Sequence, residues 1–247
     1  MSFGDGCLIA GSEDYPDGLR LDRHDHEWGQ LTFCISGVMR VIGDQAAWLS
    51  PPTRAIWLPA GVAHAIVMHG KVAARFLYLS PALAAPLAPT PQVLEVAPLL
   101  RELILFLLEI RTLHPDNPAE ARLAGLVVDL LLAARPLDLA LPLPRGERER
   151  PLVARLQEAP ADAANLGELS RCAGASLRTL QRLFPIETGL TLEAWRQKAR
   201  LLHAVAQLSA GASVNAAAFD CGYESPSAFI AAFKRQFGVT PGRFSEG

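Results

Sequence analysis

The last third of the chain repeats itself at a spacing of 49 residues, and this repeat restricts the available folds more than any other feature. The identical pairs are Cys172 and Cys221, Ser176 and Ser225, Phe184 and Phe233, Gly189 and Gly238, and Thr191 and Thr240. In each copy a short apolar segment leads to a glycine turn, and a second segment then begins at a serine suited to cap a helix. The repeat therefore predicts two helix-turn-helix units.

The expected helices can be placed on the sequence. They cover Leu166–Ala173 and the segment after Ser176 in the first copy, and Val214–Cys221 and the segment after Ser225 in the second. A long helix over Leu192–Leu208 is expected between the copies. Two helices held about 34 Å apart by such a rigid spacer can enter successive major grooves of DNA.

The second helix of the first copy has a polar face opposite its apolar one. The apolar face, which we expect to be buried, consists of Leu177, Leu180, Leu183 and Phe184. The opposite face carries Arg178, Gln181 and Arg182. Guanidinium and amide groups can form paired hydrogen bonds with guanine and adenine edges. A polar helix face is most often simply solvated, but its place in a repeated helix-turn-helix unit favours base contact.

These units resemble the DNA-binding domain of AraC-type transcriptional regulators. The stretch from Gly222 to Phe229, followed by that from Phe233 to Pro241, closely matches the family's carboxyl-terminal signature. The resemblance implies double-stranded DNA as the partner, with RNA polymerase as a further candidate. By position, it assigns DNA contacts to Ser176, Arg178, Thr179, Gln181, Arg182, Ser225, Ser227, Ala228, Lys234 and Arg235.

Two departures from the family pattern affect this assignment. Pro185 stands where the family usually has a basic residue, so we expect the first recognition helix to end or kink there and to lose a phosphate contact. The second helix carries Ala228, Ala231 and Ala232 and has few groups that can read bases. We therefore predict that the first unit supplies most of the sequence discrimination.

Charge and composition agree with a regulator of this kind but do not establish one. The 23 basic and 25 acidic residues exclude a uniformly cationic coat, although residues 150–247 carry 11 basic against 8 acidic residues. No apolar run is long enough to cross a bilayer, and the amino terminus lacks a signal-peptide pattern, so we expect a cytoplasmic protein. The four scattered cysteines are expected to be reduced, mostly buried thiols.

The rest of the sequence predicts an α+β protein. Short apolar runs separated by turn formers, up to about residue 80, favour an antiparallel β-barrel or sandwich. A helical hairpin is expected over Pro98–Leu113 and Pro118–Ala134, and it is apolar nearly all round, so we expect a homodimer. The expected divisions are a cupin-like sensor domain (1–90), a dimerisation hairpin (91–135), a linker that resists helix and strand (136–151) and the helix-turn-helix domain (152–247).

A histidine pattern near the amino terminus suggests a site. His24, His26 and Gln30 occupy even positions, hence one face of an extended strand, and His64 follows a turn about 40 residues later. The pattern resembles the two motifs of the cupin barrel, which implies a metal held by these four side chains, although Gln30 replaces the acidic ligand. Three imidazoles suit zinc, nickel, iron or copper better than magnesium or calcium.

Three functions remain open on this reasoning. The leading one is a transcriptional regulator whose cupin-like domain senses a metal or a small molecule. A second is a metal-dependent cupin enzyme, such as a dioxygenase or an isomerase, but this leaves the repeat unexplained and provides no acid–base set. A third is a DNA-binding regulator whose barrel serves only for dimerisation and binds no ligand.

Overall fold

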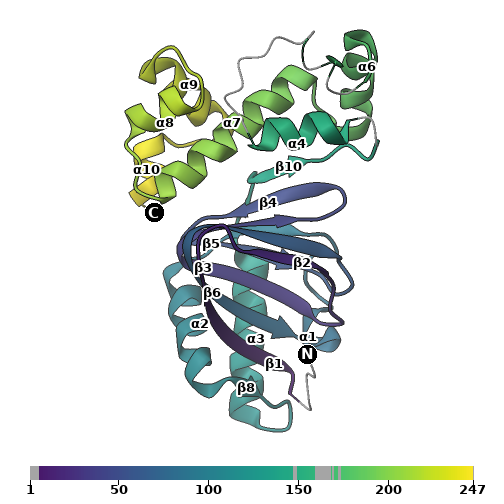
Figure 1. Ribbon diagram of the computed structural model, residues 1–247. Helices are drawn as coiled ribbons and strands as arrows, with labels where there is room; N and C mark the ends of the chain where they lie inside the picture. Colours follow the sequence, from purple (N-terminus) through teal and green to yellow (C-terminus); the bar gives the residue numbers. More distant parts are fainter. Residues whose placement is uncertain (1–5, 147–148, 159–167, 169, 172–173, 247) are drawn as a thin grey trace. The chain divides into compact units, whose positions relative to one another are not determined.

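The computed structural model describes residues 6–146, 149–158, 168, 170–171 and 174–246 (Figure 1). The chain divides into two compact units at Leu139, and the short segment Asp44–Ala47 belongs with the carboxyl-terminal unit. A sheet-rich unit precedes a helical one, which confirms the predicted α+β class. Within the described residues, no helix has both the length and the apolar character needed to span a membrane.

The first unit is built on an antiparallel sheet. Its strands run in the order β8-β1-β6-β3-β5-β7-β9, with β2 pairing β6 and β4 pairing β3 beside this path. The strands are β1 (Leu8–Tyr15), β2 (Arg20–His24), β3 (Gly29–Ile42), β4 (Ala46–Ser50), β5 (Arg54–Leu58), β6 (His64–Leu79), β7 (Gln92–Glu95), β8 (Thr112–Leu113) and β9 (Pro136–Leu137).

The long strand β6 sets the register of this sheet. It pairs with β1 and β2 along one edge and with most of β3 along the other. On the first edge His64 lies opposite His24, and on the second Tyr78 lies opposite Gln30. Strand β6 therefore brings residues that are far apart in the sequence next to one another in the sheet.

One face of the sheet is covered by two helices, α2 (Pro98–Ile110) and α3 (Pro118–Ala133) (Figure 1). A single apolar core joins them to the strands, as Leu103 and Val127 of the helices share it with Leu31 and Leu77 of the sheet. The predicted hairpin is therefore present, and it packs on the sheet through one side of each helix.

The first helix of the hairpin is shorter than predicted. It ends at Ile110, because Arg111 adopts a positive φ of 70° and the chain then forms β8. There Leu113 pairs with Leu8 of β1. The apolar residues at the end of the predicted helix are thus buried by strand pairing.

The structure also differs from the expected domain limits. The sheet continues beyond residue 90, because β7 pairs with both β5 and β9. The proline-rich segment 136–151 was expected to resist regular structure, yet it contains β9, β10 (Ala140–Pro142) and the start of α4 (Arg150–Glu158). Pairing with strands already present compensates for the poor intrinsic propensity of these residues.

The second unit is helical and is arranged along one long helix, α7 (Leu192–Ser209) (Figure 1). In Figure 1, α4 and α6 lie toward one end of α7, and α8, α9 and α10 lie toward the other. Besides α4 and α7, the helices of this unit whose bounds lie within the described residues are α6 (Leu177–Thr188), α8 (Val214–Asp220), α9 (Pro226–Phe237) and α10 (Pro241–Glu246). The sheet-rich unit also has a short helix, α1 (Pro81–Ala84).

The sequence repeat corresponds to a repeated set of helix ends. The hydroxyl of Ser176 accepts a hydrogen bond from Thr179 N (3.2 Å) at the start of α6, and that of Ser225 accepts one from Ala228 N (3.3 Å) at the start of α9. The two helices end at Gly189 and Gly238, which both adopt the left-handed conformation. The identical serine and glycine pairs thus fix the starts and the ends of the two helices.

The turns of the two helix-turn-helix units lie one residue apart in their distance from the capping serines. In the first helix-turn-helix unit Ala175 N donates to Ser170 O across Gly174, and in the second Tyr223 N donates to Ala218 O across Gly222. The equivalent bonds are 48 residues apart, although the capping serines are 49 apart. Of the first helix predicted for copy one, Leu166–Ala173, only Glu168, Ser170 and Arg171 are among the described residues, and all three are helical.

We expected α6 to end or kink at Pro185, but the helix does not end there. The helix runs through Pro185 to Thr188, where the hydroxyl of Thr188 donates to Phe184 O (2.7 Å) and Gly189 N donates to Pro185 O (3.1 Å). Pro185 is exposed, so only one hydrogen bond at the solvent side of the helix is lost.

The chain enters the helical unit through a segment anchored to α6 and α7. The indole nitrogen of Trp195 on α7 donates to Pro142 O (2.6 Å). The Glu187 carboxylate on α6 accepts from Arg145 N (2.8 Å) and Gly146 N (3.0 Å). These bonds fix the incoming segment to α7 and to the first recognition helix.

The predicted state of the cysteines can be checked for three of the four. Cys34 and Cys221 are buried, Cys7 is half-buried, and all three are free thiols. Burial raises the pKa of Cys34 and of Cys221 to about 12. Cys172 lies outside the described residues.

The capping role of the repeated serines gives the first prediction. Ser225→Ala should lower the free energy of unfolding by about 0.5–2 kcal/mol, because Ala228 N loses its acceptor at the start of α9. Ser227→Ala, two residues further along the same helix at an exposed position, should change it by less than about 0.5 kcal/mol. Chemical denaturation of the two variants measures the difference, and equal effects would contradict the capping role.

Candidate DNA interface and histidine cluster

The polar face of α6 is exposed as the sequence predicts. Arg178, Gln181 and Arg182 are all exposed, whereas Leu180 and Phe184 are fully buried. Leu177 and Leu183, which we expected to be buried, are only partly so. The groups that are predicted to read bases are therefore presented to solvent on a helix whose opposite, apolar side is buried.

The second recognition helix, α9, is anchored in the same way but presents different chemistry. Phe229 and Phe233 are fully buried, while Ala228 and Ala231 stand on the exposed side. The basic residues Lys234 and Arg235 lie exposed in its last turn, and Ser227 is exposed in its first turn. Ser176, Thr179 and Ser225 are at the helix starts, where their hydroxyl groups are engaged in capping.

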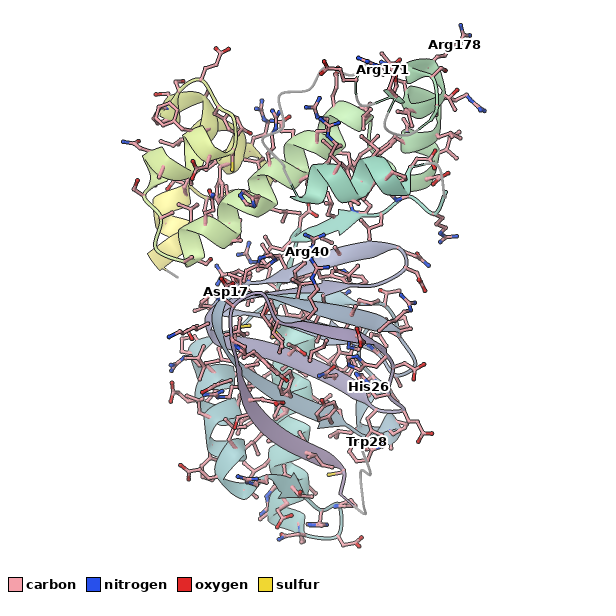
Figure 2. All side chains as sticks on the ribbon, viewed as in Figure 1. Asp17, His26, Trp28, Arg40, Arg171 and Arg178 are labelled. Carbon is pink, nitrogen blue, oxygen red and sulfur yellow. The ribbon has the colours of Figure 1, made fainter. Side chains whose placement is uncertain are left out.

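One cationic residue near this surface was missed by the sequence reasoning. Figure 2 shows Arg171 and Arg178 at the same end of the helical unit, and both are exposed. Arg171 is helical and precedes the turn at Gly174. Its place in the first helix of the unit, next to the turn, is the signal that could have drawn attention to it.

Three imidazole rings meet in the sheet-rich unit. The centroid of the His64 ring lies 4.5 Å from that of His24 and 5.3 Å from that of His26, and the His24 and His26 centroids are 6.3 Å apart. They come from β2, the following loop and the start of β6. The three histidines singled out in the sequence therefore lie close together, although the local structure predicted for them was wrong.

The expected single strand through His24, His26 and Gln30 is interrupted. Strand β2 ends at His24 and β3 begins at Gly29, so His26 lies in the connecting loop. Gly61 N donates to His26 O (2.9 Å), which holds this loop against the turn before His64. The convergence thus depends on two chain segments that β6 and this turn bring together.

The rings share one pattern of hydrogen bonds. His24 Nδ1 lies 2.7 Å from Asp22 O, His26 Nδ1 lies 2.6 Å from Trp28 O, and His64 Nδ1 lies 2.8 Å from Val62 O. Because a carbonyl oxygen can only accept, each Nδ1 carries the proton and donates. This tautomer leaves Nε2 as the nitrogen available to another partner, as in histidines that bind metals.

Gln30 joins His26 to a residue that the sequence reasoning missed. The Gln30 side chain is only 2% exposed, with its Oε1 2.8 Å from His26 Nε2 and its Nε2 donating to the Tyr78 hydroxyl (3.1 Å). Since Trp28 O and Gln30 Oε1 are both acceptors, both ring nitrogens of His26 donate in this arrangement. No local pattern points to Tyr78, because the strand register alone places it opposite Gln30.

His64 is the most deeply buried member of the cluster. Burial lowers the pKa of its imidazole to about 4, the hydrogen bond to Val62 acts in the opposite direction, and the nearby side chains of His24, His26 and Arg23 lower it further. Its Nε2 is buried without a hydrogen-bond partner among the described residues. A buried acceptor left unpaired is costly, which makes this nitrogen the strongest local indication of a missing partner.

The geometry of the cluster can be compared with that of a metal site. Two imidazoles on one zinc ion, with Zn–N bonds of about 2.0–2.1 Å, place their ring centroids about 4.5–5.3 Å apart. Both distances from His64 fall in this range, but the distance between His24 and His26 is about 1 Å too long. Accordingly, no three His, Cys, Asp or Glu side chains in the described part of the chain are already arranged to hold a metal ion.

Comparison with known families identifies both units. Residues 6–140 match the AraC-like ligand binding domain, and residues 169–247 match a helix-turn-helix domain. The chain belongs to the AraC-type family of transcriptional regulators. It is a DNA-binding regulator with a ligand-binding domain, which confirms the identification made from the repeat and its signature.

Individual relatives agree with this assignment. The chain is 33% identical over 238 residues to the HTH-type transcriptional regulator NimR of Escherichia coli strain K12, covering 96% of this chain and 85% of NimR. It is 32% identical over 134 residues to the transcriptional activator RhaS of E. coli strain SE11, covering 53% of this chain and 48% of RhaS. These relatives are regulators and not enzymes, so the catalytic alternative is set aside.

Two solved structures also align with this chain. ToxT from Vibrio cholerae aligns over 97% of this chain and 98% of its own, with 10% identity and a TM-score of 0.41. The DNA-binding domain of AdpA, solved with a target DNA, aligns over 41% of this chain and 92% of its own, with 29% identity and a TM-score of 0.38.

The different chemistry of α6 and α9 gives the second prediction. Arg178→Ala should cost about 1–3 kcal/mol of binding to the specific operator and relax the preference at one base pair, because a base contact is lost. Lys234→Ala should weaken specific and unrelated DNA alike and reduce the salt dependence by about one phosphate contact. Fluorescence anisotropy with both DNAs over a range of salt measures this, and equal losses on both DNAs for Arg178→Ala would contradict it.

Proposed function

We propose that this AraC-type regulator senses a divalent transition metal, such as zinc, nickel or iron, bound by His24, His26 and His64 with Gln30 beside them. The single observation that carries the proposal is the shared Nδ1 pattern, in which all three Nδ1 atoms donate to backbone carbonyls and the Nε2 atoms of His24 and His64 are left for a common partner. The unpaired buried Nε2 of His64 supports it.

The imidazole groups of the three histidines suit such an ion, but the position of His26 would have to change for all three to bind it. Neutral imidazoles are the usual ligands of zinc, nickel and iron. His26 must give up the Nε2 proton that it donates to Gln30 and move about 1 Å closer to His24. His26 lies in a loop, where such a movement costs less than it would in a paired strand.

A bound ion would add a connection between parts of the sheet-rich unit that are already joined by strand pairing and by the hydrogen bond between Gly61 N and His26 O. It would supply a Lewis-acidic position for a further ligand. His24 would hold it from β2, His26 from the loop and His64 from β6, so that binding favours one arrangement of these elements over others. A ligand regulates by this kind of preference between arrangements.

Metal binding gives the third prediction. The full-length protein purified without chelators should retain about one transition-metal ion per chain, and His24→Gln should weaken zinc binding by at least about 10–100-fold, because one of three imidazole ligands is removed. His24 is exposed, so this change should leave the fold intact. Elemental analysis and calorimetric titration with zinc measure both effects.

The matched control is His114→Gln, which alters an exposed histidine outside the cluster. It should bind zinc like the wild type. If the wild type binds no stoichiometric metal, or if both variants bind as it does, the metal proposal fails, and the amino-terminal unit becomes either a small-molecule sensor or a dimerisation module without a ligand.

We also propose that the regulator is a homodimer joined through α2. This helix buries one side against the sheet, yet Leu99 (58% exposed), Phe106 (48%) and Ile110 (37%) form a second apolar stripe at spacings of seven and four residues. Such a stripe has the spacing of a helix-to-helix contact. A homodimer would place two helix-turn-helix domains on one DNA and beside RNA polymerase, which we propose as a further partner.

The dimer gives the fourth prediction. Phe106→Asp should shift the protein from dimer to monomer in sedimentation analysis, because a charge would be buried in the contact. Ile186→Asp makes the same kind of change at an exposed apolar residue of α6 and should leave the dimer intact. A monomeric wild type, or a Phe106→Asp variant that remains dimeric, would rule out this contact.

A further inference from the structure

The turns of the two helix-turn-helix units show that Arg171 and Phe219 are equivalent residues. In the first unit Gly174 N donates to Arg171 O (3.1 Å), and in the second Gly222 N donates to Phe219 O (2.9 Å). Both glycines adopt a positive φ, of 58° and 75°. Arg171 and Phe219 therefore occupy the same place, on the helix before the turn and three residues ahead of its glycine.

The two residues are both exposed, but their chemistry differs. The residues before them, Ser170 and Ala218, are buried, while Arg171 is exposed and Phe219 is 58% exposed. A second exposed residue, Asp220, follows Phe219 on α8. The same place thus carries a positive charge in the first unit and an aromatic ring beside a negative charge in the second.

The charge of Arg171 is not used within the part of the chain that the structure describes. Its guanidinium forms no ion pair with the described residues. The nearest described acid along its helix, Glu168, is exposed one helical turn earlier and is not paired with it. An exposed arginine is often only solvated, so the location of Arg171 has to decide whether it binds a ligand.

That location is where a helix-turn-helix unit meets the backbone of DNA. In such units the second helix enters the major groove, and the first helix crosses the backbone beside it. Figure 2 shows Arg171 and Arg178 at the same end of the helical unit, and Arg178 belongs to the face of α6 that is predicted to read bases. A guanidinium at this end of the first helix has the position and the chemistry to bind a phosphate.

We propose that Arg171 binds a phosphate of the DNA strand that borders the groove entered by α6. At the equivalent place Phe219 cannot form an ion pair, and the carboxylate of Asp220 repels a phosphate. The first helix-turn-helix unit therefore holds the DNA backbone at a point where the second does not. This inference depends on DNA binding by the helix-turn-helix units, and it is independent of the proposed metal site and homodimer.

The salt dependence of binding tests the phosphate contact, because each such contact releases counterions from DNA. The probes for the full-length protein are an operator fragment selected from a random DNA pool and an unrelated fragment of the same length. Arg171→Gln should weaken both complexes by the same factor and reduce the slope of log K against log salt by about 0.9. The advantage of the wild type should then shrink about threefold between about 50 and 200 mM salt.

The matched control is Arg122→Gln, which removes the same charge from an exposed place on α3 in the sheet-rich unit. It should leave the slope unchanged for both DNAs. Glutamine and arginine have similar helix propensities, so both variants should keep their helices.

The converse change introduces the contact into the second unit. Phe219→Arg should strengthen both complexes and steepen the slope by about 0.9, because a guanidinium then stands where the first unit has one. Phe219→Leu keeps the place apolar and should leave the slope unchanged. Phe219 is exposed, so neither change disturbs buried packing.

The contradicting outcomes are distinct for the two residues. A slope for Arg171→Gln equal to that for Arg122→Gln overturns the phosphate contact, and so does a loss confined to the operator, which would make Arg171 a base-reading residue. A slope for Phe219→Arg equal to that for Phe219→Leu overturns the difference proposed between the two units. If Phe219→Arg fails to fold, Arg171→Gln still decides whether the phosphate contact exists.

Discussion

The pairing of β6 with the strands on both of its sides is the constraint on which the amino-terminal unit depends. It sets His64 opposite His24 and Tyr78 opposite Gln30, although the members of each pair are 40 or more residues apart. Because side chains alternate between the two faces of a strand, a slip of one residue would turn every one of these groups to the wrong face. The apolar core beneath α2 and α3 opposes such a slip, since the same register buries Leu31 and Leu77. Packing on one face of the sheet therefore determines the polar chemistry on the other.

In the helical unit, the buried side of each recognition helix is packed against the core while the opposite side is left in solvent. Helix α7 provides the spacer, and Phe184 and Phe233 fix α6 and α9 from behind at equivalent positions of the repeat. Near the entry of the chain, Glu187 binds two backbone amides and so connects α6 to the segment that arrives from the sheet-rich unit. The first helix-turn-helix unit, which has more polar groups predicted to read bases than the second, is thus also the one bound to the incoming segment.

Much of this arrangement could be predicted from the sequence, and the failures have physical causes. The repeat and its capping residues predicted the helical unit, because caps act locally and Ser176 and Ser225 meet their partners within three residues. The convergence of the histidines was predicted from a motif, but the strand assigned to them was wrong because β6 pairing ends β2 at His24. Pro185 did not end α6, since tertiary packing outweighed the loss of one hydrogen bond. Tyr78 and Arg23 could not have been found, because strand register and electrostatic proximity are properties of the folded chain.

The proposed metal site and the helix-turn-helix units are connected if metal binding at the histidine cluster changes the affinity of the protein for DNA, as we propose. Linkage requires the effect to be reciprocal, so operator DNA must change the affinity for the metal by the same factor by which the metal changes the affinity for the operator. The most direct measurement is therefore zinc titration of the full-length protein with and without its operator, beside operator titration with and without zinc. The account predicts equal factors of about 5-fold or more in both directions, and their loss in His24→Gln. Zinc that binds with the same affinity whether or not the operator is present would contradict it.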